Sequence, residues 1–181
     1  PSHPWQRVEK NGSDLSVHCE LQLMDEAERR FVSRGGLKLA GALAATSISP
    51  EGKQCLDIGQ STGGFTDCLL QMGAARVVGV DVGHGQLHDS LRQHPRVVCI
   101  EKCHARDMAA PLSPLAAHTP AEGWELLVAD LSFISLTLVL PSIALLMTNR
   151  SDAMLLVKPQ FELQPADIGK GGLVKDAALR S

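Results

Sequence analysis

The sequence predicts an α/β fold in which a mostly parallel sheet is covered by helices on both faces. Two observations lead to this prediction: five short apolar runs recur along the chain, and segments with helical spacing lie between several of them. Strands and helices that alternate in this way are joined by right-handed crossovers, which build parallel sheets. With 181 residues, of which 44% are hydrophobic and 20% charged, the chain is long enough to bury one core of this kind.

The strands are expected where valine, isoleucine and leucine cluster, as is typical of buried parallel strands. These runs cover residues 54–58, 76–80, 96–100, 125–129 and 153–157. Helical spacing predicts helices over residues 25–45, 65–72, 85–93 and 135–147. The Gly35-Gly36 pair is a candidate break in the first helix, because glycine weakens a helix interior, and Pro141 is an irregularity in the last.

A glycine-rich turn follows the first expected strand and leads into a helix; its sequence is Gly59-Gln60-Ser61-Thr62-Gly63-Gly64-Phe65. In an open parallel sheet, ligands bind at this carboxyl edge. Glycine lets the backbone approach a ligand closely, and the helix that follows offers free N–H groups to an anionic group. The spacing does not match the GxGxxG pattern of dinucleotide-binding proteins, so a nicotinamide cofactor is disfavoured.

An aspartate ends each of the first two expected strands, Asp57 on the first and Asp81 on the second. Asp57 suits a ligand with an ammonium group, such as the methionine end of S-adenosylmethionine. Asp81 could accept hydrogen bonds from both ribose hydroxyls of a nucleoside. Either acid alone could instead cap a loop or a helix. As a pair around the Gly63-Gly64 turn, they favour the two ends of one adenosyl ligand.

The fourth and fifth expected strands end at Asp130 and Lys158, which parallel pairing brings to the same rim of the sheet. Lys158 follows an apolar run, and a lysine in apolar surroundings can act as a general base for a hydroxyl, with Asp130 orienting it. Lys158 could instead be an ordinary surface lysine. On pattern alone, Lys38 is as consistent with a solvated helix residue as with a functional one.

Between about Phe31 and Asp176 the chain carries the motifs SRGGLKL, LDIG-STGGFTD, VDVG-GQL, SLRQ-PRV, ADLSFISL, LVKPQFE and GKGGLVKD. In this order they resemble the hemolysin A (TlyA) branch of the FtsJ-like RNA 2'-O-methyltransferases. The resemblance implies a Rossmann-like methyltransferase fold and S-adenosylmethionine as the methyl donor. It also implies methylation of cytidine ribose in ribosomal RNA, with ribosomal RNA or ribosomal subunits as partners.

The resemblance further implies a catalytic Lys-Asp-Lys-Glu set, whose first three members correspond to Lys38, Asp130 and Lys158. The fourth, a C-terminal glutamate, has no counterpart in a sequence that ends at Ser181, and the last strands of the family's sheet are expected to be missing with it. The implied substrate contact is Arg34. The implied donor-binding residues are Asp57, Gly59, Ser61, Thr62, Gly63, Gly64, Phe65, Asp81, Val82 and His104.

Two residues depart from the family pattern. Gln60 stands where a small residue is usual, and His104 stands where asparagine is usual. The bulk of Gln60 bears on the affinity for the donor. By the same resemblance, residues 1–24 are expected to be the remnant of an N-terminal S4-like RNA-binding domain with a linker, and residues 25–181 a C-terminally shortened methyltransferase domain.

Composition adds weaker indications. A net charge of −3 is not the basic balance of a typical nucleic-acid binder, which the loss of an S4 domain would explain. The cysteines are odd in number and are expected to be reduced thiols; Cys99, Cys103 and His104 lie close together but lack the second cluster of a metal site. No run reaches the roughly 18 apolar residues of a membrane span and no signal peptide is present, so we expect a cytoplasmic protein without metal.

Two other functions remain open at this point. The family's name suggests a membrane-acting hemolysin, although no amphipathic basic helix supports that function. A cofactor-binding RNA-recognition module without turnover is the other alternative. Methylation of RNA would distinguish a methyltransferase from both alternatives.

Overall fold

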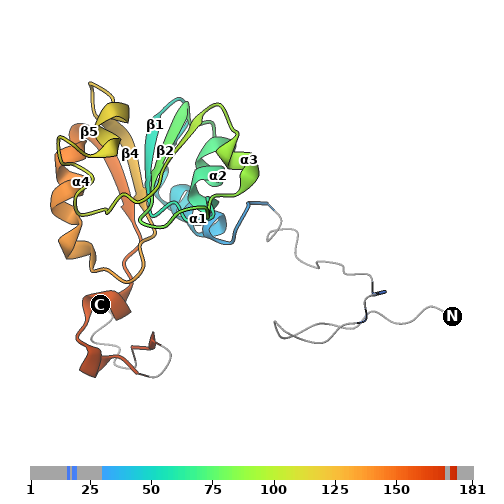
Figure 1. Ribbon diagram of the computed structural model, residues 1–181, viewed down its shortest axis with the longest axis vertical. Coiled ribbons are helices and arrows are strands. Elements are labelled where there is room, and N and C mark those ends of the chain that lie inside the picture. Colours follow the sequence, from blue (N-terminus) through green and yellow to red (C-terminus); the bar gives the residue numbers. More distant parts are fainter. Residues whose placement is uncertain (1–15, 17, 20–29, 170–171, 175–181) are drawn as a thin grey trace.

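A parallel five-stranded sheet lies at the centre of the structure (Figure 1), a computed structural model that describes residues 16, 18, 19, 30–169 and 172–174. Its strands are β1 (Gln54–Ile58), β2 (Arg76–Val80), β3 (Val97–Ile100), β4 (Trp124–Ala129) and β5 (Met147–Leu155). They lie in the order β3-β2-β1-β4-β5, and every neighbouring pair is parallel. The chain thus extends the sheet from β1 first to one side and then to the other. In such sheets a ligand-binding crevice forms at the carboxyl ends of the two strands where the direction changes, here β1 and β4.

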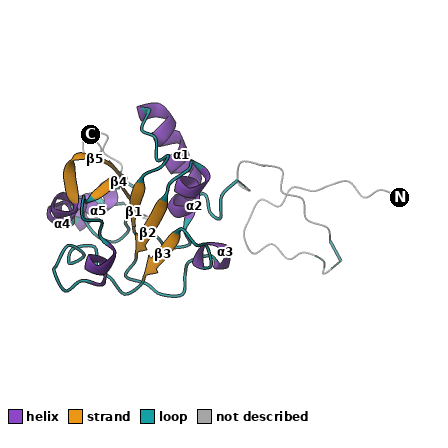
Figure 2. Cartoon of the chain, turned by 90° about the horizontal axis from the view of Figure 1, so that it is seen from above, coloured by secondary structure: helices purple, strands orange, loops and turns teal. Residues whose placement is uncertain are grey.

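Helices cover both faces of the sheet, as Figures 1 and 2 show from two directions. One face carries α1 (Gly35–Thr46), α2 (Gly64–Gln71) and α3 (Asp89–Arg92); the other carries α4 (Leu140–Leu146) and a 3₁₀ helix, Pro114–His118. Two further short helices, α5 (Pro159–Glu162) and Pro165–Asp167, follow the carboxyl end of β5. The expected fold class, a Rossmann-like α/β sheet with helices on both faces, is confirmed.

Alternating side chains of the strands build two separate cores, because successive residues of a strand point to opposite faces. On the first face Leu69 of α2 packs with Val77 of β2. On the second face Ile143 of α4 packs with Leu56 and Val78 of β1 and β2. All five residues are at most 2% exposed, so the sheet is buried on both sides.

The first two expected strands have the same bounds as β1 and β2. The fifth was expected over 153–157, but β5 runs over Met147–Leu155. Its register with β4 shifts between Trp124 and Leu126, so its first part is irregular. Residues 148–152 of this part are polar, so a search for continuous apolar runs misses the start of the strand.

Three helix predictions need correction. The helix expected over 85–93 is only Asp89–Arg92, because Gly85 has φ +67°, which a right-handed helix does not allow, and the ring of His88 caps the helix by accepting from Ser90 N–H. The segment 135–147 divides into a 3₁₀ helix, Leu136–Leu138, and α4. Pro141 lies in the first turn of α4, where its missing N–H costs nothing.

The Gly35-Gly36 pair begins α1 instead of breaking a helix. A Cβ built on Gly36 would lie 2.4 Å from the Phe31 ring, so glycine is needed for close packing there. The part of the expected helix over residues 25–29 lies outside the described residues. The proposed S4-like remnant, residues 1–24, also lies outside them apart from positions 16, 18 and 19.

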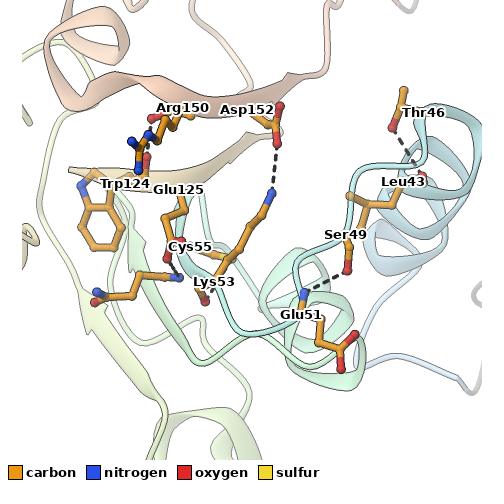
Figure 3. Close-up of polar contacts among 12 residues, drawn as sticks. Leu43, Thr46, Ser49, Glu51, Lys53, Cys55, Trp124, Glu125, Arg150 and Asp152 are labelled. Atoms are coloured by element: carbon orange, nitrogen blue, oxygen red, sulfur yellow. Dashed lines mark hydrogen bonds and ion pairs between the residues drawn. The ribbon is translucent and has the colours of Figure 1, made fainter. Parts of the chain in front are cut away.

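Polar contacts hold the amino edge of the sheet, at the end opposite the glycine-rich turn (Figure 3). Lys53, just before β1, reaches Asp152 on β5 with Nζ 3.0 Å from Oδ2. Glu125 of β4 accepts a hydrogen bond from the backbone N–H of Gln54 at 2.8 Å. These contacts tie β1, β4 and β5 together away from the carboxyl edge.

In the described part of the chain, no helix has the length and apolar character needed to cross a membrane. The cysteines are free thiols; Cys55, Cys68 and Cys103 are buried, and burial raises the pKa of each. Among the described residues, no group of three or more histidine, cysteine, aspartate or glutamate side chains could hold a metal ion.

Candidate functional site

A cavity of about 770 Å³ opens at the carboxyl edge of the sheet. Its walls come from the start of α1 and from the loops after β1, β2, β3, β4 and β5. The volume falls within the range of small-molecule sites, about 300–1,000 Å³. Most of the expected site residues line it: Lys38, Gly59, Ser61, Thr62, Gly64, Phe65, Asp81, Val82, His104, Asp130 and Lys158.

The glycine-rich turn, residues 59–63, is bonded to the sheet and to itself. The backbone N–H groups of Gly59 and Gln60 donate to the Val80 carbonyl at 2.9 and 3.2 Å. Gly59 has φ +84° and Gly63 φ +96°, so both positions favour glycine on conformational grounds. Gly63 does not line the cavity; it begins α2, where a Cβ would lie 2.3 Å from Leu91. The turn therefore presents backbone to the cavity in a fixed shape.

Asp81 lies on the cavity wall after β2 and uses both carboxylate oxygens locally. Oδ2 accepts from the backbone N–H of Ser61 and Oδ1 from that of Gly83, each at 2.7 Å. Ser61 has φ +47°, so this contact holds a backbone conformation that non-glycine residues seldom adopt. Asp81 thereby connects the β2 loop to the glycine-rich turn.

Asp57 does not line the cavity, which differs from the expected direct contact with a ligand ammonium group. It is one residue short of the end of β1 and 1% exposed, and its side chain turns toward α2 instead of out of the sheet edge. Oδ2 accepts a 2.7 Å hydrogen bond from Thr66 Oγ1. Burial raises the pKa of Asp57 to about 7, against the lowering effect of the Thr66 bonds. Asp57 thus supports the turn from behind.

Three charged side chains converge at the other end of the cavity. Asp130 lies between two lysines: Lys158 Nζ is 2.6 Å from Oδ1 and Lys38 Nζ is 3.2 Å from Oδ2. Burial opposes ionisation of Asp130, but hydrogen bonds from Lys158 and Lys38, together with their charges, outweigh it and hold the pKa of the carboxyl below its ordinary value. The geometry brings together all three residues expected to be catalytic.

Packing between α1 and α2 places Lys38 in this cluster. The Val32 N–H donates to Asp67 Oδ2 at 2.8 Å, which fixes the chain before α1 against α2. A Cβ on Gly64 would lie 2.2 Å from Ser33 Oγ, so the absence of a side chain at Gly64 lets the two segments approach. The exposed Arg34 is the N-cap residue of α1 and lies next to the cavity-lining Gly35, but is not itself part of the wall.

The loop after β4 adds Ser132 and Phe133, two residues of the ADLSFISL motif. Ser132 Oγ accepts a 2.8 Å hydrogen bond from Lys158 Nζ. Phe133 is 91% exposed with φ +64°, and its ring centroid lies 5.3 Å from that of Phe161. Phe133 also lines the cavity, so its exposed ring is a candidate contact for a ligand. Its sequence signal is a phenylalanine three residues after Asp130, which helical or strand periodicity does not register.

A family model described as FtsJ-like methyltransferase matches residues 31–181. A curated relative, the 16S/23S rRNA (cytidine-2'-O)-methyltransferase TlyA of Mycobacterium tuberculosis, is 49% identical over 172 residues, which are 95% of this chain. The chain spans 62% of the length of that relative.

Solved structures show the same likeness. A proposed hemolysin from Lactococcus lactis is 40% identical, with a TM-score of 0.76 over 83% of this chain and 69% of that one. Fibrillarin of Aeropyrum pernix, solved with natively bound S-adenosyl-L-methionine, has a TM-score of 0.55 at 19% identity over 75% of this chain and 58% of that one. At that identity the likeness concerns the fold alone.

Proposed function

This chain belongs to the FtsJ-like methyltransferase family, and from that premise we propose that it methylates a ribose 2'-hydroxyl of ribosomal RNA, at cytidine, with S-adenosylmethionine as the donor. The observation that carries the proposal is the cluster of Lys38, Asp130 and Lys158 on the wall of the cavity that the glycine-rich turn also lines. Methyl transfer to a hydroxyl needs a donor and a base at one oxygen atom. We expect the protein to act on ribosomal RNA or ribosomal subunits in the cytoplasm.

The donor fits the residues of the cavity at both ends. Each Asp81 oxygen accepts one backbone N–H, and a carboxylate oxygen has a second lone pair for a ribose hydroxyl. Apolar Val80, Val82 and Ala105 line the same part of the cavity and would cover an adenine ring, with His104 beside them. Gly64 and Phe65 at the start of α2 line the cavity, where the amino end of a helix suits the carboxylate of a methionine moiety.

When bound, S-adenosylmethionine supplies an electrophilic methyl group on a sulfonium. Lys158 would accept the proton of the ribose hydroxyl as that oxygen takes the methyl group and the sulfonium leaves as a neutral thioether. The Asp130 carboxylate stabilises the ammonium form of Lys158 that results, and Ser132 Oγ accepts a hydrogen bond from the same ammonium. This stabilisation grows as charge develops on the lysine, so it acts on the transition state more than on the ground state.

Lys38 acts differently because its side chain is 54% exposed, against 18% for that of Lys158. Its ion pair balances the charge of Asp130, and its ammonium faces the cavity, where the RNA backbone would enter. Phe133 offers a ring for stacking a base that has been turned out of its helix. Together these features support a polynucleotide substrate, which needs an open rim.

The test is transfer of a labelled methyl group to ribosomal RNA, followed by nuclease digestion and identification of 2'-O-methylcytidine. The relative from M. tuberculosis in full length serves as a positive control for the RNA. We expect labelled 2'-O-methylcytidine with this chain, and a loss of at least about 100-fold in turnover for Lys158→Ala. Binding of S-adenosylmethionine by Lys158→Ala, measured by calorimetry, should stay within about twofold.

A matched control is Lys53→Ala, which removes a lysine–aspartate pair of similar length at the opposite edge of the sheet. It should keep turnover. Full turnover by Lys158→Ala would overturn the assignment of the base, and labelling of protein or lipid instead of RNA would overturn the substrate class.

A further inference from the structure

Gln60 occupies the second position of the glycine-rich turn, yet its side chain does not fill the cavity. Gln60 and the residues on either side of it line the cavity, but Gln60 is only 3% exposed because its side chain lies inside the protein. Its bulk, which could have affected the donor affinity, is therefore accommodated inside the protein. The turn carries a long polar side chain into the core behind the donor site.

Gly79 provides the space for this side chain. It lies within β2, where it pairs with Asp57 of β1. A Cβ built on Gly79 would lie 2.0 Å from Gln60 Cδ, 2.1 Å from Nε2 and 2.5 Å from Oε1. Gly79 is not among the glycines with positive φ, so its backbone accepts any residue and only the space demands glycine. The volume of a side chain at position 79 is taken by Gln60.

A directed hydrogen-bond chain runs from Gln60 to Asp57. Gln60 Nε2 donates to Thr66 Oγ1 at 2.9 Å, and Thr66 Oγ1 donates its proton to Asp57 Oδ2 at 2.7 Å. Thr66 is fully buried in the first turn of α2. The chain thus links the turn, α2 and β1 through side chains alone, in addition to the backbone bonds of the turn.

The network has more acceptors than donors. Among the described residues, Asp57 Oδ1 and Gln60 Oε1 are buried without a hydrogen-bond partner. A proton on Asp57 would add a donor, and burial already raises the pKa of this carboxyl to about 7. Unpaired buried acceptors destabilise a structure unless the surrounding contacts hold them in place. The network is therefore sensitive to the loss of either of its two donors.

We propose that Gln60 is a positioning residue for the methyl donor: lodged in the space left by Gly79, its side chain fastens the glycine-rich turn to Thr66 and Asp57 and so fixes the backbone that faces the donor. This inference rests on the proposed function for the identity of the donor. It makes Gln60 and Gly79 a coupled pair. A side chain at position 79 would drive Gln60 out of the core, and the open space beside the turn is the cavity itself.

The experiment is a double-mutant cycle of Gly79→Ala and Gln60→Ala, with the dissociation constants of S-adenosylmethionine and S-adenosylhomocysteine measured by calorimetry. Gln60→Ala should weaken both about three- to tenfold, because the turn loses its anchor. Gly79→Ala should weaken both more than tenfold, because Gln60 is displaced into the cavity. The double variant should bind more tightly than Gly79→Ala and match Gln60→Ala, because the displaced side chain is gone.

Two further variants separate positioning from simple loss of stability. Gln60→Met keeps the volume but removes the donated hydrogen bond, and it should weaken binding as Gln60→Ala does. Val78→Ala, a fully buried change next to Gly79 on the opposite face of β2, should lower the melting temperature and leave both dissociation constants unchanged. Gln60→Met and Gln60→Ala keep the test decisive if Gly79→Ala does not fold.

Wild-type affinity in Gln60→Ala and Gln60→Met, with no relief of the Gly79→Ala defect in the double variant, would overturn the role of Gln60 while the donor assignment stands. Absence of binding by the wild-type chain would overturn the donor assignment and the positioning role with it. The two failures are therefore distinguishable in one set of titrations.

Discussion

Lys158 Nζ lies 2.6 Å from Asp130 Oδ1, although the two residues follow different strands, β5 and β4. Ala129 and Leu155 are partners in the β4–β5 register, and the Leu156 N–H donates to the Ala129 carbonyl. Parallel pairing therefore delivers the residues that follow both strands to one point. The pairing of β4 with β5, more than either loop, assembles the proposed catalytic cluster.

Lys158→Arg tests whether proton transfer matters beyond the ion pair. Arginine can keep the contact with Asp130 but stays protonated, so it cannot accept a proton. We expect turnover to fall about 10²–10⁴-fold while affinity for S-adenosylmethionine stays within about twofold. Single-turnover methylation and calorimetry measure the two quantities. Lys53→Arg, which keeps its pair with Asp152, is the control, and a Lys158→Arg variant as active as wild type would exclude the lysine as base.

Asp81→Ala should weaken donor binding about 10–100-fold, because the backbone N–H groups of Ser61 and Gly83 lose their acceptor together with the ribose hydroxyls. Calorimetry with S-adenosylmethionine measures the effect. Glu101→Gln is the matched control: Glu101 accepts from the backbone N–H of Gly85 in a neighbouring loop but does not line the cavity. Equal losses in both variants would point to general loop disorder instead of a ribose contact.

Phe133→Ala should weaken RNA binding about tenfold or more, the effect expected for loss of one stacked base. Because the ring is 91% exposed, the change should leave the melting temperature and the donor affinity almost unaltered. Fluorescence anisotropy with a cytidine-containing RNA hairpin measures binding. Leu112→Ala, at a 98% exposed apolar position that does not line the cavity, should bind RNA as wild type does. An unchanged RNA affinity in Phe133→Ala contradicts a stacking role.

The buried Asp57 predicts a dependence of folding stability on pH. Its folded-state pKa of about 7 lies above its ordinary value of 3.8, so the folded protein holds a proton that the unfolded chain releases. The resulting stabilisation is full below about pH 4, declines as the pH rises from about 4 to 7, and is absent above that window. It amounts to something on the order of 4 kcal/mol in total.

Urea unfolding of wild type and Asp57→Asn across this pH range measures the effect. The wild type should lose more stability than the variant as the pH rises. Asp107→Asn, at an exposed position, should follow the wild type. Parallel curves for wild type and Asp57→Asn would mean that Asp57 is ionised throughout.

The sequence by itself determined the fold class and the bounds of two strands, and it proposed the chemistry of the site. Apolar runs located β1 and β2 to the residue, because buried parallel strands need continuous hydrophobic sequence. The strand-end pattern proposed Asp81, Asp130 and Lys158 as site residues, and the family resemblance added Lys38; the structure places all four on the wall of one cavity. The helix bounds were less certain, because His88, Gly85 and Pro141 act through capping and φ values that hydrophobic spacing does not record.

Only the tertiary structure decided where the side chains of the site go. Asp57 of β1 and Asp81, directly after β2, lie near the carboxyl ends of neighbouring strands, yet Asp57 is buried while Asp81 lines the cavity. The side chain of Gln60, in the turn after β1, is buried as well. The exposed position of Phe133 at positive φ, with its ring beside that of Phe161 of α5, is likewise absent from the local sequence pattern. The physical reason is that the direction of a side chain is set by the space that distant residues leave open. Gly79 leaves such a space for Gln60, and no pattern within the turn itself contains that information.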